Sequence, residues 1–131
     1  MLKGSCLCGS LKYEINGELG PIVMCHCSNC RKASGSAFAT NAPVDASAVN
    51  WMSDTAALGE YESSTGVFRQ FCRRCGSQLF SRRTAMPDVL RLRIGTLDTK
   101  IMSKPTQHIF VGSKAEWCDI TDSLPQYQER P

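Results

Sequence analysis

The ten residues FCRRCGSQLF (71–80) place two cysteines, Cys72 and Cys75, in a tight turn between two apolar segments. Two thiolates on one turn can reach the same zinc ion, which needs Zn–S distances of about 2.3 Å. The second cysteine is followed by Gly76, and glycine tolerates the positive φ of a backbone that curls around a metal. The segment therefore predicts a zinc-binding turn between strands of residues 67–72 and 78–82.

The other cysteines are grouped in a similar way. The chain has 131 residues and 8 cysteines, and only Cys118 stands alone. The remaining two groups are a CxC pair, Cys6 and Cys8, which Gly9 follows, and a CxCxxC set formed by Cys25, Cys27 and Cys30. Grouped thiols of this kind indicate metal binding, because ligands of one ion must converge on one point.

Seven grouped thiols divide naturally into four and three. Four cysteines form a closed, structural zinc site, whereas three leave one position open, as catalytic zinc sites do. We assign Cys6, Cys8, Cys72 and Cys75 to the closed site and Cys25, Cys27 and Cys30 to the open one, which predicts two zinc ions per chain. Alternatives remain: a site of Cys25, Cys27, Cys72 and Cys75, two metals sharing a thiolate, structural metal only, a redox-active CxxC pair, or buried core thiols.

Length and composition fit one domain of residues 1–131. Apolar residues make up 42% of the chain and charged residues 21%, which excludes a disordered or fibrous protein. No apolar run approaches the roughly 18 residues of a membrane span, and the N-terminus lacks the apolar stretch of a secretory signal. We therefore expect a cytoplasmic protein whose cysteines bind metal rather than form disulfides.

The hydropathy pattern favours a mainly β fold. Short alternations of apolar and polar residues predict strands at residues 11–15, 22–24, 37–40, 49–52, 60–63, 67–72, 78–82, 89–94 and 108–111. Ser28–Ser34 can form one or two helical turns, with Ser28 as N-cap and Gly35 at the end. The polar tail of residues 124–131, which contains two prolines, is expected to be loose.

Four stretches of the chain follow one another in a characteristic order: GSCLCGSLKYE, CHCSNCRKASGSAF, FCRRCGSQLF and KPTQHIFVGSKAEWCDITDSLPQY. Together they resemble the glutathione-dependent formaldehyde-activating enzyme family, which also includes centromere protein V. The resemblance extends over about residues 4–127, which implies that these residues form the core of the domain. The resemblance implies a zinc-bearing β-tent of short antiparallel sheets, a closed zinc site at Cys6, Cys8, Cys72 and Cys75, and a catalytic site at Cys25, Cys27 and Cys30. It also implies a carbon–sulfur lyase that condenses glutathione with formaldehyde.

Five further residues are candidates for contacts with substrate. A glutathione thiol would be held as thiolate at the open zinc position and would add to the aldehyde carbon. Its carboxylates need cationic partners, for which Arg31 and Lys32 are candidates, and Asn29 lies inside the CxCxxC loop. His26 is expected to point away from the ion that its neighbours hold and either lines the pocket or acts as an acid or base. His108 is either a pocket residue or a partly buried strand residue.

The arginines are unevenly distributed. Residues 69–93 contain seven arginines and one acidic residue, Asp88, within a chain whose formal charge is only +3. The cluster is either an anion-binding face for nucleic acid or compensation for the negative charge of the closed zinc site. Two alternatives to an enzyme remain. One is a glutathione- or thiol-binding protein without turnover, and the other is a structural zinc module that binds protein or nucleic acid.

Overall fold

Short strands separated by glycine turns form two β-sheets in the computed structural model, which describes residues 1–131. The smaller sheet is antiparallel, with the order β1-β2-β5, and consists of β1 (Leu2–Ser5), β2 (Lys12–Ile15) and β5 (Val49–Trp51). The mainly β prediction is confirmed. No helix of the structure has both the length and the apolar character needed to span a membrane.

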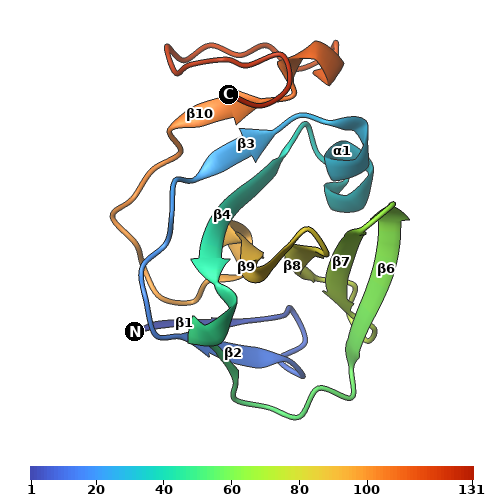
Figure 1. The fold of residues 1–131 in the computed structure, drawn as a ribbon, viewed down its shortest axis with the longest axis vertical. Coiled ribbons are helices and arrows are strands. Elements are labelled where there is room, and N and C mark those ends of the chain that lie inside the picture. The colour runs from blue at the N-terminus through green and yellow to red at the C-terminus, as the bar shows by residue number, and fades with distance from the viewer.

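The larger sheet has seven strands in the order β10-β3-β4-β9-β8-β7-β6. Its strands are β3 (Val23–Cys25), β4 (Ala39–Asp45), β6 (Leu58–Ser64), β7 (Val67–Cys72), β8 (Gln78–Arg83), β9 (Met86–Arg93) and β10 (Gln107–Ile109). Short 3₁₀ turns follow β4, β9 and β10, namely η1 (Ala46–Ala48), η2 (Ile94–Thr96) and η3 (Val111–Ser113). Figure 1 shows β1 and β2 at one end of the molecule and β3, β10 and the C-terminus at the other.

One strand pair departs from the expected antiparallel arrangement. β10 pairs with β3 in parallel, with His108 opposite Met24. A parallel neighbour needs a long connection, and here the segment between β9 and β10 runs along the side of the molecule before it reaches β3 (Figure 1). Hydropathy alternation predicts that a segment is a strand but does not show in which direction it runs.

The single α-helix, α1 (Ser28–Ser34), has the predicted bounds but a different N-cap. Cys27, and not Ser28, caps the helix, because its sulfur accepts a hydrogen bond from the backbone N–H of Cys30. Gly35 ends the helix with φ 65°, as the sequence predicted. The N-cap thus belongs to one of the candidate metal ligands, so the helix start and the cysteine cluster are formed by the same residues.

The two faces of the larger sheet have different surroundings because side chains alternate along each strand. Leu92 of β9 and Phe80 of β8 are fully buried and pack with Tyr13 and Ile15 of the smaller sheet. Tyr13 contacts the Phe80 ring edge-on, with ring centroids 5.0 Å apart. The core therefore lies between the two sheets, and the neighbouring residues of β8 and β9 point to the opposite face.

The C-terminal tail is not loose, and the prediction for residues 124–131 is wrong. His108 forms a β-bridge with Gln126, and the Phe110 backbone N–H donates to the carbonyl of Glu129 at 2.8 Å. The tail satisfies the backbone groups on the free edge of β10, a structural need that polar composition does not reveal. Cys118, which the sequence places outside the three cysteine groups, is partly exposed.

Candidate functional site

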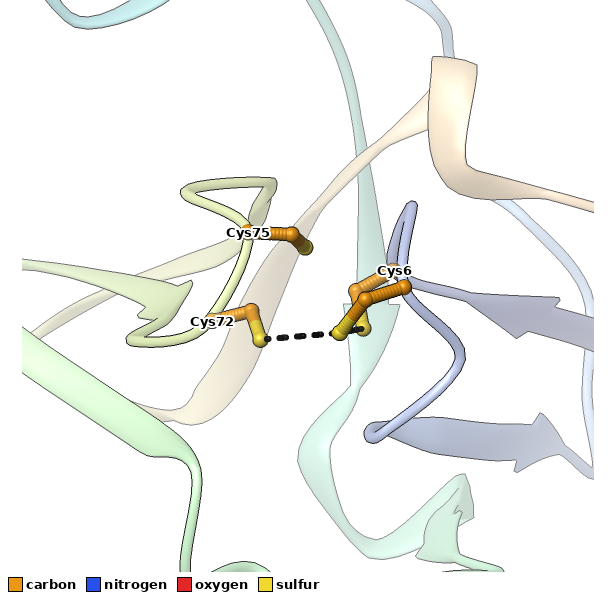
Figure 2. A group of neighbouring side chains, drawn as sticks. Cys6, Cys72 and Cys75 are labelled. Carbon is orange, nitrogen blue, oxygen red and sulfur yellow. Dashed lines mark hydrogen bonds between the residues drawn. The ribbon is translucent and has the colours of Figure 1, made fainter.

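Four cysteines converge where the two sheets meet. Cys6 and Cys8 lie in the loop after β1, whereas Cys72 ends β7 and Cys75 follows in the turn to β8. Figure 2 shows Cys6, Cys72 and Cys75 facing one another. Their sulfur atoms all lie within 4.8 Å of one another. The Cys8 sulfur is 3.7 Å from that of Cys6 and 3.8 Å from that of Cys72. A tetrahedral zinc ion with four thiolates requires sulfur atoms about 3.8 Å apart, so this cluster fits the metal.

The turns that present these thiols have the backbone that the sequence predicted. Gly9 and Gly76 adopt φ values of 80° and 79°, in the left-handed region that glycine tolerates. The Gly76 N–H donates to the Cys72 carbonyl at 2.8 Å and closes the turn. Hydrogen bonds from Ser77 lower the pKa of Cys75 to about 5, which favours the thiolate form that a metal binds.

The second cluster contains Cys25, Cys27 and Cys30, whose sulfur atoms also lie within 4.8 Å of one another. Cys25 is the last residue of β3, Cys27 caps α1 and Cys30 lies in its first turn. Hydrogen bonds from Cys25 and Cys30 lower the pKa of Cys27 to about 2, and the same contacts raise the pKa of Cys25. Cys27 is the most exposed of the three.

A buried arginine lies against this second cluster. Both terminal nitrogens of Arg69 donate to the sulfur of Cys30, at 3.9 and 3.8 Å, and its Nε donates to Ser63 at 2.9 Å. Arg69 is only 7% exposed. A charge this deeply buried needs a partner, and the thiol cluster supplies one.

The three thiols open onto a cavity of about 630 Å³ on the face of the larger sheet that points away from the core. This volume lies within the range typical of small-molecule sites. Alternate residues of the strands form its floor, including Val23, Asn41, Pro43, Val67, Ser81 and Val89. None of the four cysteines of the first cluster lines it, so only the three-cysteine cluster is open to a ligand from this cavity.

The cavity is strongly basic. Its lining includes Arg69, Arg83, Arg91, Arg93 and Arg130 but no aspartate or glutamate. Arg93 is 8% exposed and donates to the Asn41 side chain at 2.5 Å. Burial lowers the pKa of Arg93 to about 10, and the negative charge that Cys30 can carry partly opposes this shift.

The structure places the five candidate substrate residues in different surroundings. Asn29 lines the cavity, but Arg31 and Lys32 of the same helix do not. His26 and His108 do not line it either; both are buried, at 0% and 2% exposure.

The two histidines form a chain of hydrogen bonds behind the cysteines. Nε2 of His26 lies 2.8 Å from Nδ1 of His108, and Nε2 of His108 lies 2.9 Å from the Asp122 carboxylate. The hydrogen bond to His108 lowers the pKa of Asp122, and burial lowers the pKa of His26. These hydrogen bonds connect the CxCxxC loop to β10 and to Asp122, which shortly precedes the C-terminal tail.

Sequence reasoning missed Asp122 and the role of the cavity arginines. Asp122 carries no local signal, because its partner His108 is paired through a non-local contact. The arginines had a signal: Arg91 and Arg93 alternate with core leucines on β9. Alternation shows that two residues share a face, but it does not show that the face is a cavity.

Comparisons with known proteins place the chain in a family. Residues 1–113 match the family described as glutathione-dependent formaldehyde-activating enzyme. An uncharacterized lyase of Schizosaccharomyces pombe is 31% identical over 78 residues, which are 60% of this chain and 55% of that protein. The chain thus matches about half the length of this curated relative.

A solved structure resembles the fold. The crystal structure of a Rhodobacter sphaeroides protein has a TM-score of 0.63 and 24% sequence identity, and the match covers 76% of this chain and 91% of that chain. The family match includes the residues of both cysteine clusters. The chain therefore belongs to the glutathione-dependent formaldehyde-activating enzyme family.

Proposed function

We propose that this protein is a zinc-dependent carbon–sulfur lyase that condenses glutathione, or a related thiol, with formaldehyde or another small aldehyde. The observation that supports it most is the three-cysteine cluster that opens onto a ligand-sized cavity. The family match and the S. pombe relative named as a lyase point to the same class of reaction.

Two zinc ions per chain are proposed, one in each cysteine cluster. Cys6, Cys8, Cys72 and Cys75 would hold the structural ion, and Cys25, Cys27 and Cys30 the second one. When bound to three cysteines, zinc supplies an open position that takes a substrate thiol in its thiolate form.

The reaction itself requires few groups from the protein. The substrate sulfur forms a bond to the aldehyde carbon, the C=O double bond becomes a single bond, and the thiol proton ends on the oxygen. Arg69 lies beside Cys30 and would stabilise the negative charge that moves from sulfur to oxygen. Asn29 reaches the cavity from α1 and would hydrogen-bond the substrate.

The positions of the arginines favour this function over nucleic-acid binding. Arg69, Arg83, Arg91 and Arg93 line the cavity, and Arg82 forms an ion pair with Glu60 at 2.8 Å. A protein that binds nucleic acid needs its basic residues on an accessible surface stripe. Most of the arginines of residues 69–93 face a pocket whose size suits a small molecule.

The test is the rate at which S-hydroxymethylglutathione forms. The zinc-loaded protein is mixed with ¹³C-formaldehyde and glutathione, and the adduct is followed by NMR against the uncatalysed reaction. We expect a faster approach to equilibrium with the wild type, no acceleration with Cys27→Ser, and unchanged acceleration with Cys118→Ser, which lies outside both clusters.

Thiols add to formaldehyde without help, so binding must be separated from turnover. Calorimetry with glutathione alone measures binding in the same samples. Tight binding with the uncatalysed rate would overturn the lyase and leave a thiol-binding protein. A gel shift with nucleic acid that weakens as salt rises would instead favour a nucleic-acid module.

A further inference from the structure

The excess positive charge of the cavity is not explained by the cysteines alone. Arg69 contacts Cys30, and Arg93 is held by Asn41. Arg83 and Arg91 take part in none of the three ion pairs of the chain, which involve Glu14, Glu60 and Asp122. Both arginines are partly exposed and line the cavity. Two guanidinium groups without acidic partners are thus available to a ligand.

The sheet register shows how these groups are arranged. Arg91 of β9 lies opposite Ser81 of β8, and Ser81 lies opposite Arg69 of β7. Neighbouring strands are about 4.8 Å apart, so the backbones of Arg91 and Arg69 are roughly 10 Å apart across the floor. Arg83 lies two residues further along β8 than Ser81, on the same face.

The cysteines and the free arginines therefore occupy different parts of one cavity. Arg69 lies at the thiol cluster, and Arg91 and Arg83 follow it across and along the floor. Burial lowers the pKa of Arg91, while the thiols of Cys25 and Cys30 act against this shift, so Arg91 lies within electrostatic reach of both. A ligand whose sulfur is at the cysteines can place a second group at these arginines.

We propose that Arg91 and Arg83 form a carboxylate-binding site, and that the cavity selects thiols through a carboxylate and not through an amino group. The inference rests on the proposed function, because it names the class of thiol that the same cavity takes. Guanidinium groups match carboxylates in geometry and charge, and they can bind them through paired N–H···O bonds.

The lining also indicates what the site does not recognise. An ammonium group needs a carboxylate or a set of carbonyl acceptors, and the cavity contains five arginines and no acidic side chain. Glu129 lines a neighbouring hollow, together with Arg130, the next residue in the sequence. A free α-ammonium group therefore meets five arginines and no carboxylate side chain in this cavity.

The test measures binding of glutathione derivatives to the zinc-loaded protein by calorimetry. S-methylglutathione is the reference, because it has no thiol and reports the arginine site independently of chemistry at sulfur. Its diethyl ester, which lacks both carboxylates, is expected to bind about 10- to 100-fold more weakly. Its N-acetyl derivative, which lacks the ammonium, is expected to bind at least as tightly as the reference.

Variants assign the effect to residues. Arg91→Gln and Arg83→Gln should each weaken binding of S-methylglutathione about tenfold and leave the affinity for the diethyl ester unchanged. Arg82→Gln is the matched control. It removes an arginine from β8, the strand of Arg83, but the Arg82 side chain pairs with Glu60 outside the cavity. Its affinities should equal those of the wild type.

The outcomes separate this inference from the proposed function. Each of four results would overturn the inference. They are equal affinity for S-methylglutathione and its diethyl ester, equal weakening of these two ligands by Arg91→Gln, loss of affinity on N-acetylation, and no binding of S-methylglutathione. If the ester effect and its loss in the variants are observed but no adduct forms above the uncatalysed rate, the carboxylate site stands and the lyase does not.

Discussion

Replacing Arg69 by glutamine should weaken zinc binding at the three-cysteine cluster and leave the four-cysteine cluster unchanged. Arg69 is 7% exposed and directs two N–H groups to the Cys30 sulfur. Three thiolates and one Zn²⁺ ion carry a net charge of −1, which a guanidinium at this distance compensates. Glutamine keeps a polar side chain of similar length but removes the charge.

The size of the effect follows from the contact. A unit charge at 3.8 Å would contribute about 4 kcal/mol at an effective dielectric constant of about 20, before any desolvation cost. Measured hydrogen bonds to charged groups contribute about 1.5–3 kcal/mol. Because both N···S distances are long, 3.8 and 3.9 Å, we expect the lower end of that range. This corresponds to a zinc dissociation constant raised about ten- to thirtyfold.

The assay titrates the zinc-loaded protein with a chromophoric chelator, and the four-cysteine cluster serves as internal reference. Arg69→Gln should release the weaker zinc at lower chelator concentration and the tighter zinc at the wild-type concentration. Arg82→Gln should match the wild type in both phases, since Arg82 lies outside the cavity. A dissociation constant within about threefold of wild type, or equal loss at both clusters, would refute the reasoning.

Three further outcomes are expected. Cys72→Ser should abolish cooperative thermal unfolding, because the ion that Cys72 would help to hold would link the two sheets. Cys27→Ser should keep a cooperative transition within about 4 °C of wild type, about 1 kcal/mol for a chain of this size. Equal loss in both variants would contradict the division into closed and open clusters. A strong chelator should remove the adduct-forming activity at concentrations that leave the circular dichroism spectrum intact. Simultaneous loss of the activity and the spectrum would contradict the expectation that the open cluster releases its metal first. Burial raises the pKa of Tyr13 from 10.0 to about 12, so the folded state favours the neutral phenol; its contribution of about 2–3 kcal/mol is present below pH 10 and is lost as the pH rises towards 12. Urea unfolding at pH 9 and 11.5 should show this loss for wild type and a smaller one for Tyr13→Phe.

Much of the strand content could be predicted from the sequence because each alternation is local. β7 has its predicted bounds, 67–72, and β9 extends the predicted strand at 89–94 towards its N-terminus by three residues. The parallel pairing of β3 and β10 could not be predicted, because it depends on the path of the intervening chain. The pairing of the C-terminal tail with β10 depends on the same long-range geometry.

The candidate site divides in the same way. The cysteine spacing is a local property, so the two clusters predicted from it are the two that the structure brings together. Arg31 follows Cys30 in sequence but does not line the cavity, whereas Arg69 is 39 residues away and touches the Cys30 sulfur. Proximity in sequence identifies ligands that share one turn, and it fails for partners supplied by another strand.

The two cysteine clusters lie in separate hydrophobic surroundings, and this separation has a physical consequence. Only 26 of 131 residues are buried, and the main apolar cluster contains nine, among them Cys6 and Cys72. A metal at those residues would cross-link the two sheets through the core itself, so its binding energy adds to the stability of the fold. Cys25 and Cys30 pack in a second, smaller cluster with Ala39. A ligand can therefore enter, contact or displace groups at the three-cysteine cluster while the contacts that join the two sheets stay in place.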